Sequence, residues 1–243
     1  MLRRFTLAVA AVALATAILA PAALATHSWG SYHWAGTANP FTLKLGDNVS
    51  SAWDSYLATT SSDWSQSTVL DTTVVAGQTT SRKCRPTSGR IEVCNATYGS
   101  NGWLGIASIW ATGSHITQAT TKVNDTYFNT AQYNTPAWRN MVMCQEVGHD
   151  FGLDHQDEAF NNPNLGTCMD YTNDPSTNQH PNQHDYDMLA SIYAHTDSTS
   201  TVGAAVTGAA PESVERTDRI TDSTIVVRYA DGSSRITHVF WAL

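Results

Sequence analysis

Charged side chains are scarce in this chain of 243 residues, because Asp, Glu, Lys and Arg together make up only 14% of it. The 13 basic residues are outnumbered by 21 acidic ones, which gives a formal net charge of −8. Proteins that bind nucleic acid or an anionic membrane surface carry an excess of Lys and Arg on one face. We therefore expect neither nucleic acid nor a membrane surface as a partner. Uncharged polar residues must cover much of the protein surface.

Long apolar runs are lacking after the first 25 residues. Arg3 and Arg4, an apolar run over residues 5–20 and the small residues that end at Ala25 have the layout of a cleavable secretory signal. We therefore expect a signal peptide over residues 1–25 and a secreted mature chain that begins at Thr26. An uncleaved membrane anchor is the alternative, and Pro21 together with the polar continuation argues against it.

Cysteine is limited to four residues. An exported chain with four cysteines is expected to form two disulfides, for which three connectivities exist. We favour Cys84 with Cys94, because a turn-rich stretch separates them, and Cys144 with Cys168. A zinc site built from all four is the competing interpretation, and it is disfavoured because no two cysteines have the close spacing of structural zinc ligands.

The apolar and β-branched patterns predict a mixture of helices and strands. Helices are expected over residues 47–60, 137–152 and 183–194, and strands over residues 69–75, 91–93, 103–110 and 115–123. An Asn- and Pro-rich loop over residues 156–181 is too long for a simple connector, and such loops usually line a site.

The end of the chain has a different composition. Residues 196–213 are rich in Ser, Thr, Gly and Ala, so we expect a linker between a domain over residues 26–195 and a tail over residues 214–243. Within that tail, two β-prone runs surround Asp231-Gly232, which predicts a β-hairpin. The hairpin could pack on the domain, add a strand to its sheet, or be a discarded or sorting segment.

The chemically informative stretch runs from Gln145 to His155. Residues four apart share a helix face, so Gln145 and His149 point into the same space, with Glu146 beside them. Gly152 can end the helix with a positive φ, which turns the chain and returns His155 towards His149. Two imidazoles, a third donor and a neighbouring glutamate are what a catalytic zinc site needs.

These residues resemble the metzincin zinc endopeptidases, whose motif is His-Glu-x-x-His-x-x-Gly-x-x-His followed by a methionine turn. Residues 151–155 are similar to the matrixins within that superfamily, and Cys168-Met169-Asp170-Tyr171 is similar to the turn. The resemblance implies an α+β fold with a twisted mixed sheet, an active-site helix, a methionine turn and a C-terminal helix. The hairpin tail would be an addition to that fold.

The resemblance also implies a role for each matching residue. His149 and His155 would be zinc ligands, Glu146 the general base acting on a zinc-bound water, and Met169 the floor under the metal. Tyr171 would stabilise the oxyanion or complete the resting coordination, with a structural hydrogen bond as the alternative. The expected function is that of a secreted, monomeric, zinc-dependent metallopeptidase that hydrolyses peptide bonds in protein or peptide substrates.

Gln145 departs from the motif, because it stands where the family has its first histidine. A glutamine oxygen is neutral and a weaker zinc donor than imidazole. Three outcomes stay open: Gln145 ligates zinc directly, another residue such as His180, His184 or Asp157 completes the site, or the site is empty.

A degenerate zinc site would change the function. The alternative to a peptidase is a catalytically inactive module that binds protein or peptide in the same cleft, and a weaker one is a purely structural secreted domain. Calcium is possible because of the Asn- and Asp-rich loops, although nothing in the sequence indicates it.

Overall fold

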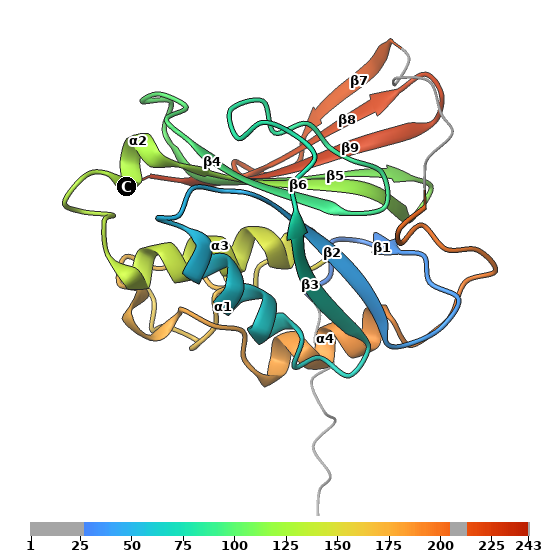
Figure 1. Ribbon diagram of the computed structural model, residues 1–243, viewed down its shortest axis with the longest axis horizontal. Coiled ribbons are helices and arrows are strands. Elements are labelled where there is room, and N and C mark those ends of the chain that lie inside the picture. Colours follow the sequence, from blue (N-terminus) through green and yellow to red (C-terminus); the bar gives the residue numbers. More distant parts are fainter. Residues whose placement is uncertain (1–26, 205–212, 243) are drawn as a thin grey trace, which may run out of the picture.

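A single mixed β-sheet, with helices on one of its faces, organises the computed structural model, which describes residues 27–204 and 213–242 (Figure 1). The strands are β1 (His33–Trp34), β2 (Phe41–Asn48), β3 (Leu70–Ala76), β4 (Ile91–Ala96), β5 (Trp103–Thr112), β6 (His115–Asn124), β7 (Val214–Arg219), β8 (Thr224–Tyr229) and β9 (Ser233–Trp241). The helices are α1 (Asp54–Trp64), α2 (Asp125–Phe128), α3 (Pro136–His149) and α4 (Gln183–Ile192), with a 3₁₀ turn over Pro175–Thr177.

The strand order across the sheet is β3-β2-β4-β6-β5-β9-β8-β7, and β1 pairs with β6 outside this path. The pairs β2/β3, β2/β4 and β4/β6 are parallel, whereas β5 runs antiparallel to both β6 and β9. Parallel strands require crossover connections, and α1 lies in the one between β2 and β3. This mixed sheet confirms the α+β class expected from the sequence.

Helix α3 lies against the sheet and forms the centre of the core. It begins cleanly because the Thr135 side chain accepts a hydrogen bond from the Trp138 backbone N–H, and Pro136 occupies the first turn. From Met141 to its end every residue of α3 is buried, and the Trp64 indole donates to the Cys144 carbonyl oxygen at 3.1 Å. Contacts on several sides therefore hold the side chains of α3 in place without any ligand.

Both expected disulfides are present, which confirms the pairing. Cys84 is joined to Cys94, and Cys144 is joined to Cys168. The second bridge connects α3 to the turn that contains Met169, immediately next to the residues of the zinc motif.

The C-terminal tail extends the sheet instead of standing apart from it. Strand β9 pairs with β5 from Trp103↔Trp241 to Thr112↔Ser233, and β8 and β7 follow beyond it, as the red strands of Figure 1 show. The tail therefore has three strands, one more than the hairpin predicted. Residues 196–204 also pack on the domain, where the Thr201 N–H donates to the Ala35 carbonyl oxygen at 2.9 Å.

The expected signal peptide over residues 1–25 lies outside the described residues. Within residues 27–204 and 213–242, no helix has both the length and the apolar character needed to cross a membrane.

Candidate active site

The two histidines of the motif meet below the sheet. His149 is the last residue of α3, and Gly152, at φ +94°, lets the chain turn back directly after it. His155 returns so that its Nε2 atom lies 3.0 Å from Nε2 of His149. The sharp turn anticipated at Gly152 is thus the feature that brings these two imidazoles together.

A third imidazole, which was not predicted as a ligand from the sequence, completes a cluster with them. His238 comes from β9, and its ring stacks on that of His149 at 4.0 Å between centroids. One ligand atom each of His149, His155 and His238 lies within 4.8 Å of the other two. A signal existed, because Ile236, His238 and Phe240 alternate along one buried face of the strand, so a lone histidine stands among core residues.

The hydrogen bonds of the first two rings fix which nitrogen is free. Nδ1 of His149 lies 2.9 Å from the Leu153 carbonyl oxygen, and Nδ1 of His155 lies 3.0 Å from Glu158 Oε1. These acceptors require N–H at both Nδ1 atoms, so in the neutral rings both Nε2 atoms carry lone pairs. Two lone pairs facing each other at 3.0 Å repel, and a cation beside them would remove that repulsion.

The protonation state also suits a metal. Burial lowers the pKa of His149 well below its usual range, and burial likewise lowers the pKa of His238 to about 4. Asp154 Oδ1 lies 3.3 Å from Nε2 of His238, which has no other partner among the described residues. Neutral imidazole is the form that ligates zinc, so this donor set fits the metal that the motif implies.

Gln145 lies one helical turn before His149 and is fully buried. Neither its amide oxygen nor its amide nitrogen has a hydrogen-bond partner within the described chain. A buried amide without partners costs free energy unless something else satisfies it. A metal ion beside His149 would satisfy the oxygen.

Glu146 places its carboxyl group directly against β5. A Cβ atom at Gly105 would lie 2.5 Å from Glu146 Oε1, so glycine at this position leaves room for the carboxyl group. Burial, and next the nearby Asp150, raise the pKa of Glu146 well above its usual range. A hydrogen bond from the Ala107 backbone to the Glu146 carboxyl group opposes this rise in pKa. Ala107 pairs with His238 across β5 and β9, so the Glu146 carboxyl group lies beside the imidazole cluster.

Met169 and Tyr171 lie on the other side of the cluster. Met169 is completely buried under α3, where a Cβ atom on Gly148 would come within 2.6 Å of its sulfur. The Tyr171 ring packs 4.2 Å from the His155 ring and 5.0 Å from Phe240 of β9, measured between centroids. Burial raises the pKa of Tyr171, so its phenol keeps its proton and can donate a hydrogen bond.

The site is closed in this structure. His149 and His238 are 1% exposed, His155 is 8% exposed, and Glu146 is 1% exposed. Strand β9 contributes both His238 and Phe240 to this cover.

The other candidates for completing the site lie elsewhere. His180 is half exposed and its Nδ1 lies 2.7 Å from Asp63 Oδ2, while the His184 ring stacks on His27 at 4.7 Å between centroids. The Asp157 carbonyl oxygen accepts a hydrogen bond from the Tyr171 N–H. Neither His180 nor His184 is part of the imidazole cluster.

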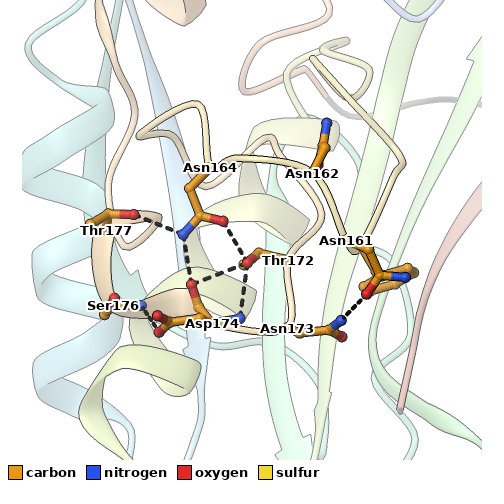
Figure 2. Close-up of a pocket in the computed structure, with 9 residues that line it drawn as sticks. Asn161, Asn162, Asn164, Thr172, Asn173, Asp174, Ser176 and Thr177 are labelled. Carbon is orange, nitrogen blue, oxygen red and sulfur yellow. Dashed lines mark hydrogen bonds between the residues drawn. The ribbon is translucent and has the colours of Figure 1, made fainter.

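The Asn-rich loop lines an open polar pocket of about 430 Å³, shown in Figure 2. Many of its polar groups bond to one another: Asn164 Nδ2 donates to the Asp174 carbonyl oxygen at 2.8 Å, and Asn173 Nδ2 donates to Asn161 Oδ1 at 2.7 Å. Phe160, which also lines the pocket, stacks on Tyr171 at 4.8 Å between centroids. The pocket therefore adjoins the covered cluster through these two rings.

No protein-family model matches this chain, and no curated protein matches it. Two solved structures of myroilysin show a distant likeness, at 12% and 13% identity over 70% of this chain and 85% and 89% of theirs, with TM-scores of 0.41 and 0.38. High choriolytic enzyme 1, a hatching enzyme zinc-protease from Oryzias latipes, is 10% identical over 68% of this chain and 95% of its own, with a TM-score of 0.37. Such values do not assign a function, which must come from the site itself.

Proposed function

We propose that this protein is a secreted zinc-dependent peptidase whose described form is closed by its own C-terminal strand. The observation that carries the proposal is the convergence of three buried imidazoles beside Glu146. His149, His155 and His238 would hold the metal through nitrogen, and the Gln145 amide oxygen would be the fourth donor. This set contains the predicted ligands and adds the one that the sequence analysis missed.

Zinc, when bound, supplies a Lewis acid that polarises a peptide carbonyl and acidifies a water molecule. The chain's own groups do the rest of the chemistry. Burial is the main cause of the raised pKa of Glu146, so departure of β9 would lower that pKa; the ionised Glu146 then accepts the proton of the attacking water and returns it to the leaving amine. Tyr171 donates its phenol proton in a hydrogen bond to the oxygen on which negative charge develops. Met169 and the Cys144–Cys168 bridge keep these groups in place under α3.

The closed state follows from the number of donors. Structural zinc sites have four protein ligands, whereas catalytic sites keep one position open. With Gln145 and three imidazoles present, no position stays open. Departure of β9 would remove His238, open one position and free the edge of β5. An extended peptide can pair with such a free edge by adding a strand to the sheet.

A reversible lock tests this proposal. The Ser108 and Thr237 hydroxyl oxygens lie 3.0 Å apart across β5 and β9, so the double variant Ser108→Cys/Thr237→Cys can form a disulfide that holds β9 on β5. We expect the oxidised variant to hydrolyse no peptide from a mixed substrate library, and activity to appear after mild reduction. The wild-type chain with the same reductant is the matched control for its two native disulfides.

Two outcomes would overturn the proposal. Equal activity of the locked and the reduced variant would show that β9 does not cover the peptide-binding site. No hydrolysis in either state, combined with peptide binding by the reduced variant only, would favour the inactive peptide-binding module over the enzyme.

A ligand test separates the roles of the donors. His149→Ala should lose the metal of this cluster, whereas His238→Ala should keep it with lower affinity on the three remaining donors. Because the metal then no longer holds β9 in place, β9 should leave β5 more often and His238→Ala should hydrolyse peptides faster than the wild-type chain. Loss of this zinc in His238→Ala would show that His238 replaces Gln145 as an essential ligand instead of closing the site.

A further inference from the structure

A second group of imidazoles lies near the C-terminal end of α4, whereas the Asn-rich loop over residues 156–181 precedes this helix. His33 belongs to β1, His115 begins β6, and His195 and Asp197 follow α4. Asp197 Oδ1 lies 3.1 Å from His115 Nε2, 3.6 Å from His33 Nε2 and 3.8 Å from His195 Nε2. The Nε2 atoms of His33 and His195 are 3.2 Å apart. The ligand atoms of His33, His195 and Asp197 thus all lie within 4.8 Å of one another, and His115 contacts the same carboxylate from outside this group.

We propose that His33, His195 and Asp197 form a second metal site, which binds zinc and fastens the segment after α4 to β1. Two imidazoles and one carboxylate make three protein donors, and a water molecule can take the fourth tetrahedral position. In a tetrahedral site with ligands about 2.0–2.1 Å from zinc, neighbouring donor atoms lie about 3.3 Å apart. The three separations within this group, 3.2, 3.6 and 3.8 Å, come close to this spacing before any ion is added.

Hydrogen bonds outside the cluster orient its donors. Nδ1 of His33 lies 2.8 Å from the Ser31 carbonyl oxygen, so the N–H is on Nδ1 and Nε2 presents a lone pair to the cluster. Asp197 Oδ2 accepts the Gly36 N–H at 3.1 Å, which leaves Oδ1 for the imidazoles. Such bonds behind the ligating atoms are typical of metal sites, because they hold each ligand in its binding orientation.

The backbone also brings the three segments together without the ion. His33 and His115 are register partners in the parallel pair of β1 and β6, and their rings meet at 5.0 Å between centroids. The Asp197 N–H donates to the Gly36 carbonyl oxygen at 2.7 Å, which places the segment after α4 next to β1. A zinc ion here would therefore fasten the end of the domain, just before the tail begins, to β1.

The alternative is a set of ion pairs without metal, in which one or more protonated histidines surround Asp197. Zinc stoichiometry distinguishes the two, because ion pairs bind no zinc. The mature chain, secreted in zinc-replete medium and desalted without chelator, should hold about two zinc ions by elemental mass spectrometry. His195→Ala, in which a half-exposed side chain is removed, and Asp197→Asn, which keeps an oxygen for the Gly36 N–H, should each hold one.

Matched variants keep this test independent of the proposed peptidase. His180→Ala removes another half-exposed histidine that contacts an aspartate, and it should still hold two ions. His149→Ala should hold one ion, and in that variant Co²⁺ should give the visible absorption of a four-coordinate site that disappears when His195→Ala is added. Equal zinc content in the wild-type chain, His195→Ala and Asp197→Asn would overturn the second site. Equal zinc content in the wild-type chain and His149→Ala would instead count against the active-site cluster alone.

Discussion

The two imidazole clusters of this molecule use the same kind of side chain in different surroundings. In the active-site cluster the three histidines are at most 8% exposed, and a glutamate carboxyl lies beside them without being a donor. In the second cluster His195 is half exposed, and the carboxylate of Asp197 is itself one of the converging groups. The roles that we propose for the two clusters therefore rest on the neighbours of the histidines more than on the histidines themselves.

The means of closure differ as well. The active-site cluster is completed by β9, a strand from the tail, and so could lose one donor if that strand left β5. The second cluster is completed by Asp197, which backbone hydrogen bonds fix to Gly36. A removable donor suits a site that must open, and a fixed donor suits one that holds two segments together.

The carboxyl group beside each cluster is expected to affect hydrolysis differently, and Glu146 should affect it most. Glu146→Gln should lower peptide hydrolysis by about 10³-fold, within the range usual for losing a general base, while both zinc ions remain. The measurement is the rate of hydrolysis together with zinc content, made in the His238→Ala background. Glu215→Gln, at an exposed position of β7, is the control and should change neither quantity. Undiminished hydrolysis by Glu146→Gln would exclude it as the base.

The two disulfides should differ in how much each contributes to the free energy of unfolding and to zinc binding. Replacing Cys144 and Cys168 by Ser removes a bridge of sequence separation 24, which should lower the free energy of unfolding by roughly 3.5 kcal/mol and weaken zinc binding at the active-site cluster only. Replacing Cys84 and Cys94, with separation 10, should cost roughly 2.7 kcal/mol and leave both sites occupied. Denaturant unfolding with parallel zinc analysis measures both. Zinc loss from the second cluster in the first variant would break the assignment.

Metal removal should discriminate the clusters by exposure. A chelator should withdraw zinc first from the half-exposed cluster and only later from the buried one, giving two phases of release. Because a ligand at about 100 times its Kd adds about 2.7 kcal/mol of stability, each phase should lower the melting temperature. Zinc release followed with a coloured indicator, alongside thermal melting, measures this order. A single phase, or a melting temperature unchanged by the chelator, would contradict the comparison.

Gly105 of β5 leaves room for the Glu146 carboxyl group, and filling that room should lower the rate of hydrolysis only modestly. Gly105→Ala places a methyl group where Glu146 now lies, so it should displace the carboxyl group, lower hydrolysis about tenfold and leave both zinc ions bound. Gly36→Ala is the control, because a Cβ atom there meets its neighbours at an ordinary 3.5 Å. Rates for both variants in the His238→Ala background provide the comparison, and equal rates would place Glu146 away from the reaction.

Local signals in the sequence predicted much of what positions the active site. The helical spacing of α3, the glycine turn after it and both disulfide pairings depend on residues close together in the chain or on a few cysteines, and the structure contains all of them. Strand β2 was not predicted, because its last residues, Asp47 and Asn48, were assigned to the start of the following helix, which begins at Asp54.

The pairing of strands that are far apart in the sequence could not be predicted from local patterns. His238 reaches His149 only because β9 adds to β5, and no local pattern specifies which edge a terminal strand will join. The second cluster draws on His33 and His195, each of which is a lone histidine in its own segment. Sequence spacing carries no signal for donors that the topology of the sheet brings together.

The most direct test is a crystal structure of the zinc-loaded mature chain with anomalous diffraction measured on both sides of the zinc absorption edge. We expect two anomalous peaks, one between His149, His155 and His238 and the other between His33, His195 and Asp197. A zinc peak at the first position with His238 directed away from it, or no peak there at all, would contradict the claim that the chain's own C-terminal strand closes a zinc site.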